Sequence, residues 1–371
     1  MHVSLYVGHH KVGSTSLQVF LSQNVVRLIR HGILYPYTDM QGAASVAARM
    51  LKGDRSGVLP VNIREPHSAL AYRLMNEANG FRIPGQFSML PHRQQMMRAI
   101  RAQVAEFKPK SVVLCSEAFA NFGAVKPELV TTVTEMFPKA TFSVYAALRR
   151  PDTYLASWHN QRIKVCEKAT PLWGAGWQQY LRTIHLDYRL AVEDWLIRVP
   201  GDQKVLRNYS DIVASGGSEA DYMAHSGIGF PTDLVPAKRA NKSLHPALLE
   251  IARQANHVLP QPEAHALVQF LLKADSRLDL PPAKEVELFG AVGRAELHTA
   301  FLPVHAWLSG ITAQDAFFPD IDAILDCNPV AQAEATRHAL NQLQGDMLTG
   351  LPAPLTDFLA HLRATYSLSE V

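Results

Sequence analysis

The chemistry-bearing residues nearest the amino terminus lie in one short segment, GHHKVGSTS, residues 8–16. Its two glycines, Gly8 and Gly13, have the spacing of a Walker A loop, which reads G-x-x-x-x-G-K-[ST]. The lysine is displaced, because Lys11 stands two residues before the second glycine and Ser14 follows that glycine directly. Backbone N–H groups at the start of a helix, with hydroxyl and ammonium donors beside them, can bind a phosphate-like anion. The alternative is a tight strand-to-helix turn in which the serine caps the helix and no ligand binds.

The elements that must position this loop alternate between strand-like and helix-like patterns. A β-rich run, residues 2–8, ends at the loop, and apolar residues then recur at spacings of three and four up to the stop signal His31-Gly32. These helix-face residues are Leu17, Phe20, Leu21, Val25, Leu28 and Ile29. Further strands are predicted at residues 111–117, 140–150 and 203–209. Helices are predicted at residues 93–107, after Pro127, from near Pro151, and across Trp177, Tyr180, Tyr188 and Trp195. The alternation indicates an α/β fold with a central parallel sheet.

The remaining segments are interpreted as additions to that sheet. Residues 38–108 contain an irregular and helical insertion, and its part over residues 38–92 has weak hydrophobic periodicity. Residues 243–371 are predicted to be a mostly helical elaboration, with helical patterns at 245–259, 263–274, 283–292 and 331–344. Because no linker rich in glycine, serine or charge interrupts the chain, residues 1–371 are predicted to form a single domain.

The composition favours a soluble protein with a sizeable core and argues against several kinds of site. The chain has 371 residues, 47% of them hydrophobic, and a formal net charge of +3, which is too small to indicate wholesale nucleic-acid binding. Its three cysteines are far apart without a C-x-x-C pattern, which argues against a disulfide framework and a zinc site. Cys115, inside an apolar run, is expected to be inert packing. No apolar run has the length of a signal-peptide core or a transmembrane helix, so we expect a cytoplasmic protein.

The segment around Lys11 resembles a loop of one enzyme family. The pattern K-x-G-[ST]-T after a first strand is similar to the 5′-phosphosulfate loop of sulfotransferases that use 3′-phosphoadenylyl sulfate (PAPS). A second cofactor motif of that family is an arginine at the end of a later strand and a serine eight positions on. Arg149 and Ser157 match it within LRRPDTYLASWHNQ. Residues 16–36 and 149–164 also resemble bacterial sulfotransferase-family proteins, with a weaker likeness further along the chain.

The resemblance implies a P-loop-type three-layer sandwich and a sulfotransferase activity. Such an enzyme transfers the sulfuryl group of PAPS to a hydroxyl, or to an amine, of a glycan, a lipid-linked sugar or a small metabolite, and needs no metal. Arg149 and Ser157 would hold the 3′-phosphate. The loop would hold the 5′-phosphate, and Lys11 would stabilise charge on the bridging oxygen as its bond breaks. The loop residues assigned to the cofactor are Lys11, Gly13, Ser14, Thr15 and Ser16.

The acceptor must also lose a proton. In the family the base sits at the end of the strand between the two cofactor motifs, as a histidine in many members and a glutamate in others. That strand here ends in VVLCSEAF, which makes Glu117 the candidate base. A carboxylate whose pKa is raised by partial burial can accept a proton near neutral pH. His10 and His9 are the reserve bases. The alternatives are structural: a helical first turn or an arginine pair for Glu117, and packing or capping for the histidines.

Two departures limit what the resemblance implies about adenine. Ser16 stands where the steroid and phenol sulfotransferases place an aromatic residue against the base. Their glycine-rich lysine motif near the carboxyl terminus is not apparent. Arg239, Asn241 and Lys242 form a basic cluster that either closes over the 3′-phosphate or lies in a solvated loop.

Two other functions stay open. A P-loop nucleotide kinase is the alternative enzyme, and both the displaced Lys11 and the Arg149–Ser157 pair argue against it. A catalytically inactive nucleotide-binding module that acts through partners is the other, and the presence of Lys11 argues against it.

Overall fold

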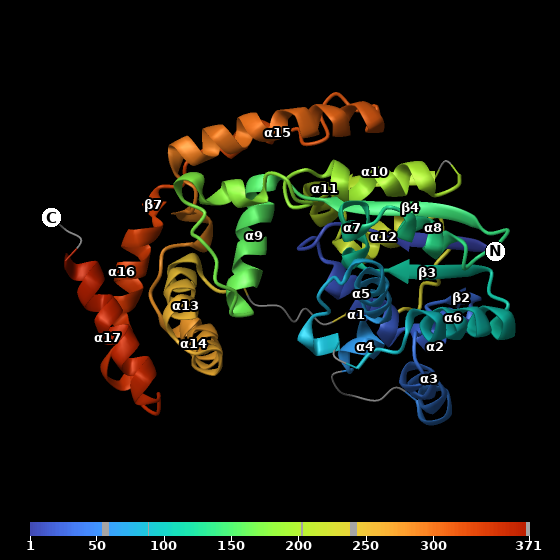
Figure 1. The fold of residues 1–371 in the computed structure, drawn as a ribbon, viewed down its shortest axis with the longest axis horizontal. Helices are drawn as coiled ribbons and strands as arrows, with labels where there is room; N and C mark the ends of the chain where they lie inside the picture. Colours follow the sequence, from blue (N-terminus) through green and yellow to red (C-terminus); the bar gives the residue numbers. More distant parts are fainter. Residues whose placement is uncertain (54–58, 88, 202, 238–242, 369–371) are drawn as a thin grey trace. The chain divides into compact units, whose positions relative to one another are not determined.

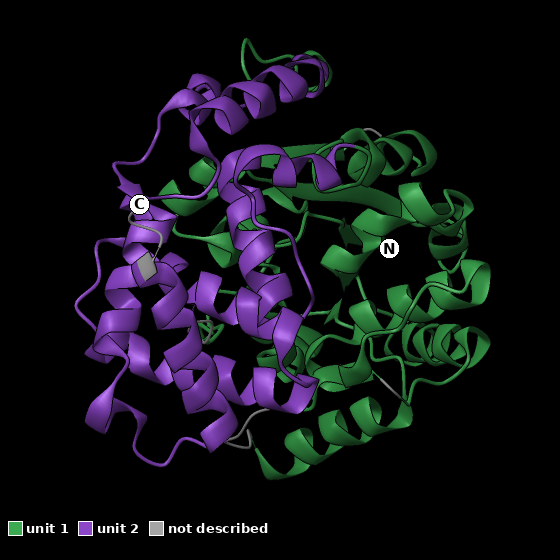
Figure 2. Ribbon diagram, turned by 60° about the vertical axis from the view of Figure 1, so that its left-hand side comes forward, with its two compact units in different colours: residues 1–150, 182–240, 308–317 green, residues 151–181, 241–307, 318–371 purple. Residues whose placement is uncertain are grey.

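The computed structural model describes residues 1–53, 59–87, 89–201, 203–237 and 243–368. Figure 1 shows the helices and strands coloured along the sequence. The chain divides into two compact units, which Figure 2 shows in different colours. Unit 1 comprises residues 1–150, 182–240 and 308–317, and unit 2 comprises residues 151–181, 241–307 and 318–371. Each unit is therefore assembled from segments that are far apart in the sequence. The single domain expected for residues 1–371 stays a prediction.

Unit 1 contains a five-stranded parallel sheet in the order β2-β3-β1-β4-β5. The strands are β1 His2–Tyr6, β2 Ile33–Leu34, β3 Ser111–Cys115, β4 Thr141–Leu148 and β5 Gln203–Asn208. The three central strands are almost entirely buried, as expected of a parallel sheet with both faces covered. The predicted strands at residues 2–8, 111–117, 140–150 and 203–209 are confirmed. The short edge strand β2 lies outside the prediction, because two residues are too few to show a periodicity.

Helices flank this sheet, so the predicted α/β fold with a central parallel sheet is confirmed, and the arrangement is consistent with a three-layer sandwich. A buried cluster joins α1 Ser14–Gln23, α2 Val25–Arg30 and α12 Ser218–His225 to strand residues that include Tyr6 and Tyr145. The other α-helices of unit 1 are α3 Met40–Lys52, α4 Val61–Arg64, α5 Pro66–Asn79, α6 Arg93–Phe107, α7 Phe122–Val125, α8 Glu128–Thr134, α10 Arg189–Arg198 and α11 Tyr209–Ala214. Its 3₁₀ helices are η1 Gly85–Phe87 and η2 Glu117–Asn121.

Two helical stretches of unit 1 differ from the prediction. The helix expected after the loop is divided at Asn24, whose side chain turns away to donate to the carbonyls of Phe20 and Val235, at 2.9 and 2.8 Å. The segment 38–92 is more helical than expected. Its longest helix, α5, buries polar and small side chains such as Ser68 as well as leucines, which weakens the hydrophobic periodicity on which the prediction depended.

Unit 2 is mainly helical and has its own buried cluster. Its α-helices are α9 Pro151–Lys164, α13 Pro246–Val258, α14 Gln261–Ala274, α16 Gln332–Gln342 and α17 Ala353–Leu368, and α15 Gly290–Thr312 begins in it. Its 3₁₀ helices are η3 Gly174–Tyr180, η4 Asp275–Arg277, η5 Ala283–Glu285, η6 Ile321–Leu325 and η7 Gly345–Leu348. Two short strands, β6 Val286–Glu287 and β7 Val330–Ala331, pair in parallel. The predicted helices at residues 245–259, 263–274 and 331–344 are confirmed.

The continuous helix predicted at residues 283–292 is wrong. This stretch holds η5, β6 and the first residues of α15. The Glu287 carboxylate accepts hydrogen bonds from the backbone N–H groups of Phe289 and Gly290, at 2.8 and 2.9 Å. A side chain that binds the backbone in this way offers it an alternative to the helical ladder, so the chain turns before α15 begins.

The helix predicted across four aromatic residues is also wrong. Trp177 and Tyr180 lie in η3 of unit 2, whereas Tyr188 and Trp195 lie at and within α10 of unit 1. At Gly176 the backbone lies close to the Pro171 carbonyl oxygen, which a Cβ at this position would meet. All four aromatic side chains are buried.

The described helices include none that is both long enough and apolar enough to cross a bilayer. Within the same described residues, no three His, Cys, Asp or Glu side chains are grouped so that they could share a metal ion. The three cysteines are free thiols, of which Cys115 is buried as predicted.

Candidate functional site

The predicted site residues of unit 1 follow three adjacent strands. The loop 8–16 follows β1, Glu117 follows β3, and Arg149 follows β4. Because β3, β1 and β4 are hydrogen-bonded neighbours and run parallel, their carboxyl ends meet at one edge of the sheet. The chain also passes over β1 between β3 and β4, which makes this edge a topological switch point, where α/β sheets bind ligands.

The loop has a left-handed backbone at two positions. Lys11 has φ 61°, and Gly13 has φ 85° and ψ 11° and precedes the first residue of α1, Ser14. The N–H groups of residues 7 and 9 donate to the carbonyls of Tyr145 and Ala147 in β4, at 2.9 and 3.0 Å, which fixes the first half of the loop to the sheet. The residue at the cap position is Gly13, and it makes no side-chain cap, so the serine-capped turn considered as an alternative does not occur.

Replacing Gly13 with alanine is expected to destabilise the protein by about 3 kcal/mol, because a left-handed residue with a Cβ and an overpacked contact each cost about 1–2 kcal/mol. A Cβ at this position would lie 2.0 Å from the Ser218 Oγ. The matched control is Gly80→Ala, since Gly80 has φ 65° but a Cβ there would have no neighbour within 4 Å. Urea unfolding of both variants, followed by circular dichroism, measures the difference. Equal losses of stability would show that the Ser218 contact does not constrain the loop.

Lys11 lies close to the other predicted groups. Its charge acts on both Glu117 and His10. The Nη1 of Arg149 approaches the Lys11 carbonyl oxygen at 3.5 Å, which links the turn after β1 to the turn after β4. The two anion-binding turns predicted from the sequence are thus neighbours at one edge of the sheet.

β3 ends at Cys115, and after one intervening residue, Ser116, Glu117 begins η2. Its Oε2 accepts a hydrogen bond of 2.7 Å from the Gln18 amide, and the Ser14 hydroxyl also binds this carboxylate. Burial raises the pKa of Glu117, and the hydrogen bonds from Ser14 and Gln18 and the charge of Lys11 oppose that rise. The structure therefore brings Lys11, Ser14 and Glu117 together, and a carboxylate with a raised pKa is suited to accept a proton near neutral pH.

The polar residues that surround Glu117 include some that the sequence reasoning missed. Gln18 lies one helical turn after Ser14, so helical spacing could have placed it on the same face of α1. The Ser68 hydroxyl of α5 donates to the Gln18 Oε1 at 3.2 Å and lies 2.9 Å from the Ser116 Oγ. Ser68 had no sequence signal, because it belongs to the segment without clear periodicity.

The two loop histidines have different environments. His9 is buried, its Nε2 lies 2.6 Å from the Ile184 carbonyl, and its ring packs edge-on against Tyr188 at 4.5 Å. Burial and then the charge of His10 lower the pKa of His9 to about 3. Burial and then the charge of Lys11 lower the pKa of His10 to about 4. Both imidazoles are therefore neutral at pH 7. The contacts of His9 match its packing alternative, whereas a role for His10 stays a prediction.

The two remaining hydroxyl residues of the loop, Ser16 and Thr15, lie in the first turn of α1. Ser16 donates to the Glu219 Oε1 at 2.7 Å, and Thr15 is half-buried in the first turn of α1. The backbone N–H of residue 16 belongs to that first turn and is an orphan of the helix start. The side chain assigned to the cofactor at position 16 is thus bound within the protein, and phosphate binding by its backbone N–H stays a prediction.

Arg149 lies against the end of β5. Its guanidinium carbon is 5.2 Å from the centre of the Tyr209 ring, and its carbonyl oxygen accepts a hydrogen bond of 2.7 Å from the Tyr188 hydroxyl. Tyr209 follows β5, so it lies at the same edge of the sheet as the other residues of the site. Tyr209 was not among the predicted site residues, although its position at the end of a predicted strand could have placed it at this edge. Ser157 lies in α9, in unit 2, so its pairing with Arg149 stays a prediction. The basic cluster at positions 239, 241 and 242 lies outside the described residues.

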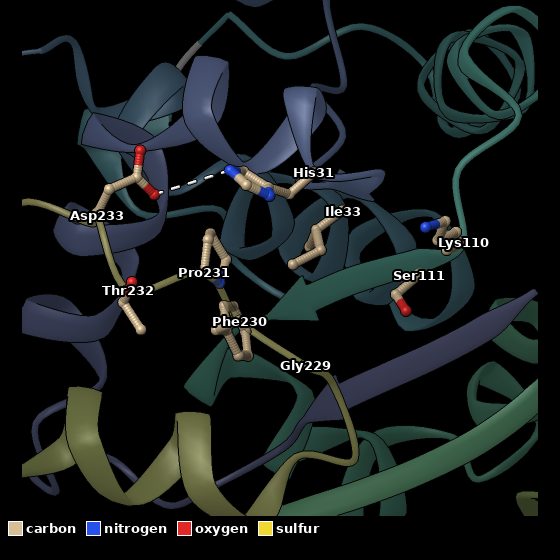
Figure 3. A pocket seen from close by; sticks show the side chains of 9 residues that line it. All are labelled: His31, Ile33, Lys110, Ser111, Gly229, Phe230, Pro231, Thr232 and Asp233. Carbon is tan, nitrogen blue, oxygen red and sulfur yellow. Dashed lines mark ion pairs between the residues drawn. The ribbon is translucent and has the colours of Figure 1, made fainter.

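A cavity of about 730 Å³ lies elsewhere in unit 1 (Figure 3). Ile33 and Ser111, the first residues of β2 and β3, line it, so it opens at the amino-terminal edge of the sheet, opposite the loop. His31 and Asp233 face each other there, with 3.8 Å between the imidazole Nε2 and a carboxylate oxygen. None of the predicted site residues lines this cavity.

No family model, curated protein or solved structure matches the chain.

Proposed function

We propose that the protein is a PAPS-dependent sulfotransferase with a P-loop-type donor site. The observation that carries the proposal is the position of Lys11, Glu117 and Arg149 after three adjacent parallel strands. At that edge the amino end of α1, with Lys11 and Arg149 beside it, can bind the donor, and the Glu117 carboxylate can act on the acceptor. A donor with phosphates at two ends and an acceptor hydroxyl would use all three groups.

The donor is held at its two phosphate ends. The N–H groups at the start of α1, including that of Ser14, and the Thr15 hydroxyl bind the 5′-phosphate, because the helix dipole and the orphan N–H groups favour an anion there. Arg149 binds the 3′-phosphate. ATP and ADP lack that phosphate, so this end of the site selects the donor.

The reaction is a transfer of one sulfuryl group. The acceptor oxygen forms a bond to sulfur, and the bond between sulfur and the bridging oxygen of the 5′-phosphate breaks. Glu117 takes the acceptor proton, and Lys11 stabilises the charge that develops on the leaving phosphate. Holding both substrates in line beside these groups lowers the entropic part of the barrier.

The acceptor is a hydroxyl compound, or an amine, of the glycan, lipid-linked sugar or small-metabolite class.

A thermal-shift comparison tests the donor assignment. PAP, the desulfated donor, is expected to stabilise the full chain by about 2.7 kcal/mol at a hundredfold excess over its Kd, without magnesium, and ADP by much less. In Arg149→Ala the advantage of PAP over ADP should be lost, since truncating one partner of a buried charge pair costs about 2–5 kcal/mol. Arg198→Ala, which removes a partly exposed arginine paired with Asp194, is the control.

The alternatives predict other results in the same assay. Stabilisation by Mg-ATP that equals or exceeds the effect of PAP would favour the nucleotide kinase. Binding of PAP without sulfuryl transfer to any member of a broad acceptor panel would favour the inactive nucleotide-binding module.

A further inference from the structure

The donor loop is in contact with the amino end of α12, a helix that the sequence did not connect with it. The Ser218 hydroxyl donates to the Val12 carbonyl at 3.0 Å, and a Cβ on Gly13 would collide with that same hydroxyl. One residue further, the Glu219 Oε1 accepts the 2.7 Å hydrogen bond from Ser16. Two consecutive residues of α12 therefore contact both halves of the loop.

α12 is itself anchored to the sheet. Asp221, whose side chain is 0% exposed, accepts hydrogen bonds from the Tyr145 hydroxyl of β4 at 2.6 Å and from the Arg207 guanidinium of β5 at 2.8 Å. The Ser215 hydroxyl donates to the same carboxylate at 2.9 Å. A buried carboxylate with this many donors makes a rigid connection, because each partner lost would leave a buried charge unsatisfied.

We propose that Glu219 is a positioning residue of the donor site. Glu219 acts through its hydrogen bond with the Ser16 hydroxyl, which we call the tether. This bond fixes the first turn of α1 in the orientation that presents the backbone N–H groups of the turn to the donor phosphate. The inference rests on the proposed function. It also assigns Ser16 a different role from direct phosphate binding by its side chain.

The charge of Glu219 and its contact with Ser16 have opposite effects on donor binding. A carboxylate near the loop repels a phosphate, so removing the charge alone would tighten binding. The tether keeps the loop in its binding conformation, so removing the contact would weaken binding. Glu219→Gln keeps an acceptor oxygen for Ser16 without the charge, whereas Glu219→Ala removes both, and the two variants separate these effects.

The experiment is a double-mutant cycle on the full chain, with the Kd of PAP measured by isothermal titration calorimetry. Ser16→Ala is expected to weaken PAP binding about tenfold, the loss for a hydrogen bond to a charged group. Glu219→Ala should weaken it by less, because this variant also removes the charge that repels the phosphate. Because the two side chains act through one contact, the double variant should bind no more weakly than either single variant. Glu219→Gln should bind at least as tightly as the wild type.

Glu193→Ala, which removes an exposed glutamate of α10, is the control and should leave the Kd unchanged. Melting temperatures show that each variant is folded, and Ser16→Ala tests the contact from its other side if Glu219→Ala does not fold. Independent, additive effects, or tighter binding by Glu219→Ala, would overturn the positioning role while leaving the donor site in place. A wild-type protein that does not bind PAP would overturn the proposed function and this inference with it.

Discussion

Replacing Lys11 with alanine is expected to lower kcat for sulfuryl transfer by about 10²–10³-fold, the range for removing one preorganised charge-stabilising donor. The Kd of PAP should change far less, because the N–H groups of α1 and Arg149 still bind both phosphates. Lys11 acts mainly on charge that develops as the sulfur–oxygen bond breaks. The substitution adds no backbone strain, since lysine and alanine carry the same Cβ at a residue with φ 61°.

The matched control for this variant is Lys110→Ala. Lys110 lines the cavity at the opposite edge of the sheet, so its loss should leave kcat and PAP binding unchanged. Single-turnover transfer of radiolabelled sulfuryl groups from PAPS and calorimetric titration with PAP give the two quantities separately. A Lys11→Ala variant that retained the wild-type kcat would remove Lys11 from the mechanism. A variant that lost PAP binding and kcat to the same extent would make Lys11 a ground-state binding residue.

Replacing Glu117 with glutamine is expected to lower kcat by about 10²–10⁴-fold, the usual contribution of a positioned general base. Glutamine has nearly the same shape and keeps an oxygen that can accept the hydrogen bond from Gln18, so the loss reflects the missing base. The control is Glu77→Gln on α5, which removes the charge of a partly exposed glutamate that pairs with Arg73 and Arg93, away from the loop. An active Glu117→Gln variant would assign proton removal to another group, and His10 would then be the first to test.

The same variant is expected to be more stable than the wild type at neutral pH, by about 1 kcal/mol. Burial raises the pKa of Glu117 above its unfolded value, so the folded protein binds this proton more tightly than the unfolded chain does. The contribution of Glu117 to stability is therefore present below its unfolded pKa and is lost as the pH rises through its folded pKa.

Thermal unfolding at a series of pH values checks this sign. The melting temperatures of Glu117→Gln and the wild type should coincide at acidic pH, where the wild-type carboxyl is protonated. They should separate as the pH rises toward neutrality, with the variant higher. A wild-type protein more stable than the variant at pH 7 would mean that hydrogen bonding from Ser14 and Gln18 outweighs burial at this site.

Local patterns in the sequence determined the sheet and the positions of the site residues along it. Apolar or β-rich runs indicated β1, β3 and β4, because strands buried on both faces tolerate few polar side chains. β5 is more polar and less buried. The strand–loop–helix unit around Lys11 was also readable, since Gly13 supplies the left-handed backbone that the turn needs. Once these strands were known to be parallel, the residues after them had to lie at one edge.

The tertiary structure decided which side chains meet at that edge and which strands are neighbours. The order β2-β3-β1-β4-β5 brings the turns after β3, β1 and β4 together, and no local pattern records strand order. Ser16 and Glu219 are 203 positions apart, and Gln18 and Glu117 are 99 apart, so their contacts leave no trace in local spacing. At residues 283–292 the Glu287 carboxylate turns the backbone through hydrogen bonds that helix propensity does not contain. In the aromatic segment, the backbone at Gly176 lies so close to the Pro171 carbonyl oxygen that a Cβ would collide with it. Periodicity reports which face of an element is buried, whereas the partner on that face is set by the packing of the whole unit.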